Sequence, residues 1–302
     1  MSHTSLSSAS APIHSVSDYL DCMQVVMVNT TLPANIGSAA RAMHTMGLSR
    51  LTVVDPKLPI DESSVSHAAG GSDLLASAII APTLESAIAN YQLVFAASSR
   101  SRHLPRPVVT PTQAAQIMLA FIDNQSALNT QGEDDLDIDH ADNSKNKPNI
   151  AILFGREDRG LTNEELACAD YHIQIDANPN YPVLNVASAV QVIASFIFAY
   201  TQGHVQANAK TDDISLDDNK SVTTQPTVDV HLRQQWDEPA ITQQQLQQLT
   251  QRTTDLMVQR GLADSEHLKS LPSRLSRLGS RLQLDQKEYQ LLSALIAKLS
   301  KV

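Results

Sequence analysis

The stretch IAILFGREDRGLT (Ile150–Thr162) decides the fold class. Its first five residues are all apolar, which is typical of a short strand buried on both faces, as in a parallel sheet. A charged loop between two glycines follows. Thr162 and Glu165 then form a capping-box pattern at the start of a helix predicted over Asn163–Ala169. The stretch therefore predicts one strand–loop–helix unit.

The same unit recurs along the chain. Further strands are predicted at Gln24–Val28, Leu51–Val54, Leu93–Ala97 and Tyr171–Ile175, and further helices at Gly37–Met46, Leu84–Tyr91, Pro111–Asp123 and Leu184–Tyr200. This alternation predicts an α/β fold with a parallel sheet flanked by helices.

Composition divides the 302 residues into four parts. Residues 1–20 are rich in Ser and Ala and lack the pattern of a signal peptide, so we expect a disordered tail and a cytoplasmic protein. Residues 21–202 hold the strand–helix units, with an acidic loop insertion at about residues 127–148 that a surface loop tolerates. Residues 203–230 are predicted to be an acidic linker. Residues 231–302 carry leucines at helical spacing and are predicted to form a small helical module.

The charge of the chain is unevenly distributed. The net charge of −10 taken alone argues against nucleic-acid binding. Residues 269–301, however, contain seven Lys or Arg residues against two acidic ones, so the C-terminal end is basic. No run of eighteen apolar residues occurs, and we therefore expect no membrane-spanning helix. Cys22 and Cys168 have no CxxC partner, which favours two reduced thiols over a disulfide or a metal site.

Three segments place small or polar residues after predicted strands, where ligands bind in open α/β sheets. They are NIGSAARAM (Asn35–Met43), FGREDRGLT (Phe154–Thr162) and NPNYPVLNVASA (Asn178–Ala189). In the first, Arg41 is the only charge on a small, apolar helix start. The alternative there is a tightly packed helix whose arginine reaches to water.

In the second segment, four charges at a strand-to-helix turn favour a functional loop, because exposed ion pairs add little stability. The alternative is a loop whose charges pair with one another. In the third, Asn185 either binds a ligand or caps the following helix, and both interpretations stay open. A fourth segment, SSRSR (Ser98–Arg102), suits a phosphate-facing loop or an exposed basic turn. The common nucleotide-binding, zinc-protease and serine-hydrolase motifs do not occur.

Longer versions of the first three segments carry a family resemblance. NIGSAARAMHTMGL (Asn35–Leu48), ILFGREDRGLTNEEL (Ile152–Leu166) and IQIDANPNYPVLNVASAVQVIA (Ile173–Ala194) resemble the three motifs of SPOUT RNA methyltransferases, and most closely those of the TrmJ-like tRNA ribose methyltransferases. The resemblance runs from Gln24 to Tyr200 and resumes weakly around Leu271–Leu299. It implies a parallel sheet whose C-terminal part forms a trefoil knot, and a homodimer.

The resemblance also implies the cofactor, S-adenosyl-L-methionine, bound bent in the knot. The contacts it implies are Ala97, Ser98, Ser99, Gly155, Ile175, Pro182, Val183 and Leu184. Related proteins usually carry Ser where this chain has Val183. Because valine cannot donate a hydrogen bond, a hydroxyl-dependent step at this position would be lost.

The implied reaction is methylation of a ribose 2′-hydroxyl in the tRNA anticodon loop, at the pyrimidine of nucleotide 32. By the resemblance Arg41 is catalytic, and Asn35, Glu157 and Asn185 position it and the substrate. Since arginine normally stays protonated, we expect Arg41 to stabilise the developing alkoxide or to bind the adjacent phosphate. Arg102, Arg274, Arg277 and Arg281 are expected to contact RNA. Two alternatives are methylation of ribosomal RNA and a noncatalytic RNA-binding module.

Overall fold

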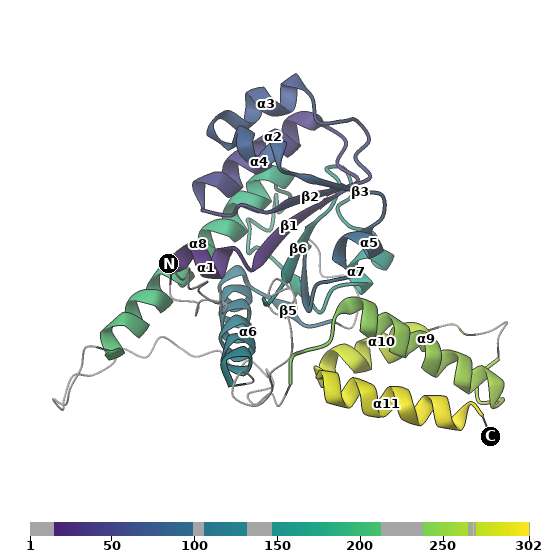
Figure 1. The fold of residues 1–302 in the computed structure, drawn as a ribbon. Helices are drawn as coiled ribbons and strands as arrows, with labels where there is room; N and C mark the ends of the chain where they lie inside the picture. The colour runs from purple at the N-terminus through teal and green to yellow at the C-terminus, as the bar shows by residue number, and fades with distance from the viewer. Residues whose placement is uncertain are drawn as a thin grey trace, which may run out of the picture.

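A seven-stranded parallel sheet forms the centre of the protein (Figure 1). The computed structural model describes residues 15–98, 106–131, 147–212, 238–264, 268 and 270–301. The strands are β1 (Met23–Val28), β2 (Leu51–Val54), β3 (Ile79–Ala81), β4 (Leu93–Ala97), β5 (Val108–Val109), β6 (Ile150–Phe154) and β7 (Tyr171–Ile173). Their order across the sheet is β3-β2-β1-β6-β4-β7-β5. The predicted α/β fold with a parallel sheet is therefore confirmed.

Successive strand residues enter two separate cores, which explains the uninterrupted apolar runs. Val25 and Met27 of β1 lie in the larger core, whereas Val26 and Val28 lie in the smaller one on the opposite face. Because strand side chains alternate between faces, a strand covered on both sides must be apolar at every position.

Helices cover both faces of the sheet (Figure 1). The larger core receives residues from α1 (Val16–Leu20), α2 (Pro33–Thr45), α6 (Pro111–Gln131) and α8 (Val186–Asp212). The smaller core receives residues from α5 (Leu84–Ile88) and α7 (Asn163–Ala167). The short α3 (Glu62–Ala68) and α4 (Ser72–Ala76), joined by a 3₁₀ turn (Ala69–Gly71), pack beside α2. Gly37 of α2 allows this close approach, since a Cβ there would lie 2.0 Å from the carbonyl oxygen of Ser64.

Two predicted boundaries were wrong. The tail predicted over residues 1–20 contains helix α1, which is capped by Ser15 and buries Tyr19 and Leu20 in the larger core. The linker predicted from residue 203 begins inside α8, which continues to Asp212. Most of the predicted insertion and linker lies outside the described residues.

Helix α8 contains one stretch, Val186–Asn208, that by length and composition alone matches a membrane-spanning helix. In the structure its Val190, Ile193 and Ile197 are buried in the larger core, where α8 contacts α2 and α6. This packing accounts for its apolar composition, because a helix covered by neighbours on several sides loses its polar positions.

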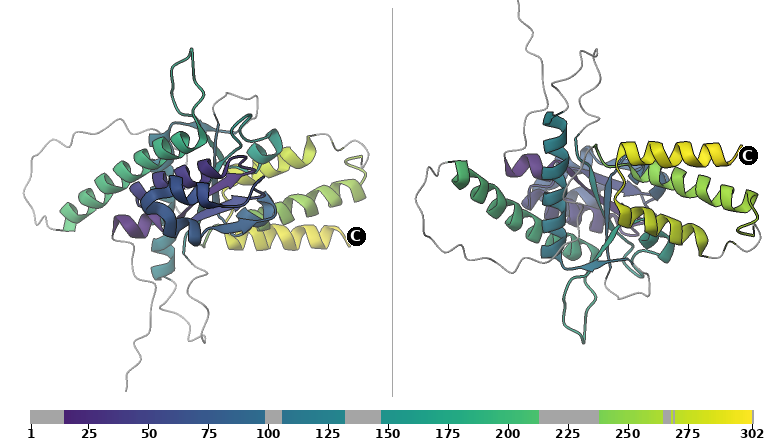
Figure 2. Two further views of the ribbon diagram at one scale, coloured as in Figure 1. Left: turned by 90° about the horizontal axis from the view of Figure 1, so that it is seen from above. Right: turned by 90° about the horizontal axis from the view of Figure 1, so that it is seen from below.

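Three further helices form a C-terminal module, defined here as residues 238–301. They are α9 (Gln243–Gln259), α10 (Leu271–Leu282) and α11 (Gln286–Leu299). Helix α9 contacts both others, and Gly279 of α10 allows a close approach because a Cβ there would lie 2.3 Å from Cδ1 of Leu246. In both views of Figure 2 the module extends from one side of the molecule and the end of α8 from the other.

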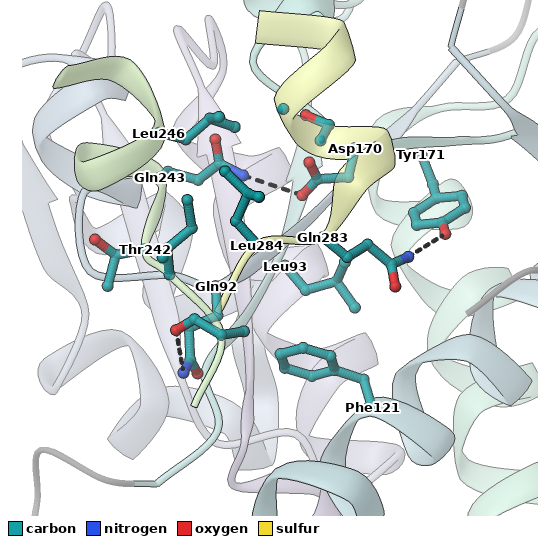
Figure 3. Close-up of a pocket in the computed structure, with 14 residues that line it drawn as sticks. Gln92, Leu93, Phe121, Asp170, Tyr171, Thr242, Gln243, Leu246, Gln283 and Leu284 are labelled. Carbon is teal, nitrogen blue, oxygen red and sulfur yellow. Dashed lines mark hydrogen bonds between the residues drawn. The ribbon is translucent and has the colours of Figure 1, made fainter. Parts of the chain in front are cut away.

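The module docks at the amino ends of the strands. Backbone amides of Gln243 and Gln244 donate to the carbonyls of Tyr91 and Ala89, just before β4. The Nε2 atom of Gln243 donates to Oδ2 of Asp170, just before β7, at 3.0 Å (Figure 3). Apolar side chains from both parts, among them Leu93, Phe121, Leu246 and Leu284, surround this contact and enclose a cavity of about 40 Å³.

Candidate active site

The loops after β4, β6 and β7 converge on one cavity of about 270 Å³ at the carboxyl ends of the strands. Its size is close to the lower end of the range for small-molecule sites, about 300 Å³. Its walls include Ala97, Ser98, Gly155–Gly160, Ile173, Ile175, Pro182–Leu184, Val186 and Ala189. The backbone amide of Ser98 donates to the carbonyl of Ile173 at 2.9 Å, so two of the three loops are joined directly.

The loop Gly155–Gly160 forms a tight turn that only glycine permits at its start. A Cβ on Gly155 would lie 2.2 Å from the backbone of Gly160 and Leu161. Gly160 has a φ of +68°, and its amide donates to the carbonyl of Arg156 at 2.9 Å. The two glycines in the sequence motif are therefore required by the backbone geometry of the cavity wall.

Arg156 anchors this loop to the neighbouring elements. Its guanidinium pairs with both carboxylate oxygens of Glu165, at 2.8 and 3.1 Å, and also donates to Oδ1 of Asn29 at the end of β1. The side chains of Arg156 and Glu165 are only 14% and 15% exposed. Arg156 was not predicted as a site residue, because nothing in the sequence distinguishes it from the exposed charged residues beside it.

Glu157 points toward the start of α2. Its carboxylate accepts hydrogen bonds from the backbone amides of Thr31 and Leu32, at 2.9 and 3.2 Å, and from Nδ2 of Asn35 at 2.8 Å. Burial opposes ionisation of this group, but the bonds from Asn35 and Thr31 outweigh it and hold the pKa of Glu157 below its usual value. Glu157 therefore remains ionised at neutral pH.

Asn185 completes the polar group. Its Nδ2 donates to Oδ1 of Asn35 at 3.1 Å, and its Oδ1 accepts from the backbone amide of Ala187 at 2.9 Å. Asn185 thus caps α8 and also contacts Asn35, so the capping interpretation is confirmed, whereas ligand binding by Asn185 stays a prediction. The structure brings together three residues from three predicted segments: Asn35, Glu157 and Asn185.

Other predicted residues lie elsewhere or outside the described part. Arg41 is exposed on α2 and does not line the cavity of its own chain. Arg274, Arg277 and Arg281 lie on α10, which belongs to the module that docks at the amino ends of the strands, away from the cavity. Ser99 and Arg102 lie outside the described residues. Val183 lines the cavity and is 49% exposed, next to Tyr181, which is 77% exposed.

A sequence model of the SpoU rRNA Methylase family matches residues 22–195, more than half of the chain. The chain therefore belongs to this family and is a methyltransferase. The methyl donor of the family is S-adenosyl-L-methionine, which confirms the cofactor predicted from the sequence.

Individual relatives refine this assignment. The chain is 32% identical to the tRNA (cytidine/uridine/adenosine-2′-O-)-methyltransferase TrmJ of Pseudomonas aeruginosa (strain UCBPP-PA14), over 94% of this chain and 95% of that protein. It is 41% identical to TrmJ of Escherichia coli O6:K15:H31, over 58% of this chain and 62% of that protein. The predicted resemblance to TrmJ-like proteins is thereby confirmed.

Solved structures agree with the fold. TrmJ from Z. mobilis ZM4 superposes with a TM-score of 0.65 and 24% identity, covering 91% of this chain and 98% of that one. A probable methylase family protein from Haemophilus influenzae Rd KW20 superposes with a TM-score of 0.52 and 29% identity, covering 93% and 97%. Both superpositions include the C-terminal module as well as the sheet.

The residues of the cavity fit this methyl donor. Ile173, Ile175 and Leu184 offer apolar walls for a flat base, and the loops Gly155–Gly160 and Pro182–Leu184 offer backbone groups at the rim. Such walls would hold the adenine of the donor, and Glu157, which also lines the cavity, is hydrogen-bonded to Asn35. Among the described residues, no cluster of three His, Cys, Asp or Glu side chains is arranged to hold a metal ion.

Proposed function

We propose that this protein methylates a ribose 2′-hydroxyl in the anticodon loop of tRNA, at the pyrimidine of nucleotide 32. The observation that carries the proposal is the similarity to the Pseudomonas TrmJ over 94% of the chain, which includes the C-terminal module. The module has a basic stripe suited to nucleic acid, whereas the chain as a whole is acidic. The family model is named for rRNA, so ribosomal RNA is the alternative substrate.

In this mechanism, the chain orients the ribose and stabilises the charge that develops on its oxygen. The bound donor supplies the methyl group on a sulfonium centre. Arg41 lies beside the 2′-oxygen or the adjacent phosphate and stabilises the negative charge on that oxygen while the hydroxyl proton passes to water. Asn35, Glu157 and Asn185 hold the start of α2 against the cavity loops, so the hydroxyl approaches in line.

We propose a homodimer in which Arg41 acts on the cavity of the partner chain. Two observations support this arrangement. Arg41 is exposed and does not line its own cavity. Tyr181, Val183 and Leu184 at the cavity rim are exposed apolar side chains that a second copy would cover.

A mixing experiment tests this arrangement. Arg41→Ala removes the guanidinium, and Ile175→Trp fills the cavity, so each homodimer should be inactive. A heterodimer purified through two different tags should regain one working site out of two, because its open cavity receives an intact Arg41 from the partner. A heterodimer as inactive as its parents would refute action across the interface.

Mass spectrometry of tRNA and rRNA from a strain lacking the gene tests the function. The expected result is loss of one ribose methyl group from the tRNA anticodon loop, with rRNA unchanged. Loss from rRNA with tRNA intact would establish the alternative substrate. Calorimetric titration with S-adenosyl-L-methionine tests catalysis separately, since an absence of binding would favour a noncatalytic RNA-binding module.

The threading of the chain belongs to the same proposal. Strand β7 lies between β4 and β5, although these two are joined first along the chain. In a trefoil knot, a later segment of the chain passes through a loop formed by an earlier connection, so the position of β7 between β4 and β5 supports this proposal. An electron-density map that traces residues 99–105 and 174–185 would show whether the chain is knotted. We also propose a cytoplasmic location, where tRNA is available.

A further inference from the structure

Three arginines gather where the C-terminal module meets the catalytic domain. Arg106, just before β5, donates from Nη2 to the carbonyl of Ala167 at 2.8 Å and to Oγ of Ser276 on α10 at 3.4 Å. Ser276 is followed directly by Arg277, and Arg281 lies one turn further along the same helix face. Arg106, Arg277 and Arg281 are named the junction cluster.

The junction cluster concentrates positive charge that the described residues only partly neutralise. Burial lowers the pKa of Arg106, and the charges of Arg277 and Arg281 lower it further, whereas Asp170 and Cys168 act in the opposite direction. Nη1 of Arg106 is buried without a hydrogen-bond partner among the described residues. Like charges held together are unfavourable for folding, and an anion bound between them relieves this repulsion.

Contacts between the module and the domain hold the three arginines of the junction cluster in place. Asp170 accepts hydrogen bonds from the backbone amide of Val94, at 2.9 Å, and from Gln243 (Figure 3). Gln283, at the end of α10, donates to the hydroxyl of Tyr171 at 3.5 Å. Helix α10 is therefore held by its polar side against the domain, and its basic face lies next to Arg106.

We propose that the junction cluster binds a phosphate group of the RNA backbone, so that one contact of the substrate is shared by the catalytic domain and the module. Guanidinium groups suit this task, because their paired donors match phosphate oxygens. The inference rests on the proposed function, because it assumes that the substrate is RNA. It adds Arg106 to the RNA-binding residues expected from the sequence.

The cluster lies at the amino ends of the strands, whereas the cavity lies at their carboxyl ends. Arg106 and Asp170 precede β5 and β7, whereas Ala97 and Ile173 end β4 and β7. The five residues of β4 span four steps, so its two ends are about 13 Å apart at a rise of about 3.3 Å per residue. In the sequence, residues 99–105, which include Arg100 and Arg102, lie between Ser98 at the cavity and Arg106 of the cluster. The phosphate bound at the cluster is thus remote from the methylated ribose.

The test uses the full chain and total tRNA from a strain lacking the gene. The double variant Arg277→Gln/Arg281→Gln should bind this tRNA about tenfold more weakly or worse, and the slope of log affinity against log salt should fall by about two. Arg106→Gln should lower the slope by about one. Arg252→Gln, on the exposed side of α9, is the matched control and should retain the wild-type slope.

Three readouts separate the outcomes. Unchanged melting temperature and unchanged binding of S-adenosyl-L-methionine in the double variant show that fold and cavity are intact. If the wild-type chain methylates this tRNA and the double variant keeps its affinity and salt slope, the phosphate site is refuted while the proposed function stands. If the wild-type chain transfers no methyl group to this tRNA, the proposed function fails, and the inference fails with it.

Discussion

Glu157 joins the cavity loop to the start of α2 through bonds that require an ionised carboxylate. Both oxygens accept from N–H groups: the amides of Thr31 and Leu32 and the side chain of Asn35. In Glu157→Gln an NH₂ group replaces one acceptor and faces donors. We expect the methylation rate to fall by about 10²-fold through misplacement of the substrate. Glu164→Gln, on the exposed side of α7, is the control and should keep the wild-type rate.

The pH dependence of the same contact has a definite sign. The pKa of Glu157 in the folded protein lies below its usual 4.5, so its stabilising effect is complete above that value. The effect is lost as the pH falls through the lowered folded pKa. Thermal unfolding at pH 3 to 6 should therefore show a steeper acid decline in the wild type than in Glu157→Gln. Parallel curves would contradict this account.

Single residues show where sequence reasoning succeeds. The segments that contain Asn35, Glu157 and Asn185 were predicted to lie near one another because each follows a strand, and the resemblance implied that the three residues act together. Their mutual hydrogen bonds confirm that they meet, whereas their catalytic role stays a prediction. Arg156 could not be recognised, because its partners Asn29 and Glu165 are defined only by the fold. In the proposed homodimer, the position of Arg41 relative to a cavity depends on a second chain, which one sequence does not describe.

At the scale of elements, the turn after β6 depends on a glycine that no other residue can replace. In Gly155→Ala the new methyl group would overlap the backbone of Gly160 and Leu161, so the loop must open. We expect a loss of about 1–3 kcal/mol in unfolding free energy, as for other overpacked sites, and weaker binding of S-adenosyl-L-methionine. Calorimetric titration and thermal melting check both.

A matched glycine provides the control. Gly203 lies in α8, and a Cβ added to it would meet no atom within 4 Å. Gly203→Ala should stabilise the protein by about 0.5–1 kcal/mol, because alanine loses less backbone entropy in a helix. A destabilised Gly203→Ala, or an unaffected Gly155→Ala, would show that the local geometry has been misjudged.

The elements predicted well are those with strong apolar runs. Leu51–Val54, Leu93–Ala97 and Ile150–Phe154 have the predicted bounds as strands, because all are buried on both faces. Strands β3 and β5 were missed, since they are short, lie at the two edges of the sheet and carry exposed Ile79, Ile80 and Val108. Helix α1 was missed because five residues are too few to show a helical period.

At the scale of the whole molecule, a buried carboxyl lies in the contact between domain and module. Burial raises the pKa of Asp170 in the folded protein above its usual 3.8, against the effect of the Val94 amide and Arg106. As the pH rises from 3.8 through the folded pKa, the folded protein must ionise a buried group, and stability falls. The difference in melting temperature between Asp170→Asn and the wild type should therefore increase from pH 4 to pH 8.

Removal of the module should separate binding from catalysis. A chain ending at Asp212 keeps every residue of the cavity but exposes Leu93, Phe121 and Tyr171. We expect it to melt at a lower temperature, to bind S-adenosyl-L-methionine as before, to remain dimeric and to bind tRNA more weakly. Light scattering, calorimetry and gel-shift titration measure these properties. Unchanged tRNA affinity would assign the module another role.

The distance between the cavity and the junction cluster has a consequence for substrate choice. The cavity loops follow β4, β6 and β7, and Arg106 precedes β5 of the same sheet and bonds to Ser276 of α10, so we expect the spacing of the two sites to be nearly fixed. With an RNA phosphate bound at the junction cluster, as proposed, a nucleotide would be methylated only when that phosphate lies at a fixed distance from its ribose. Inserting or deleting one base pair in the stem below the target loop should shift methylation to a neighbouring nucleotide or abolish it, whatever the identity of the base.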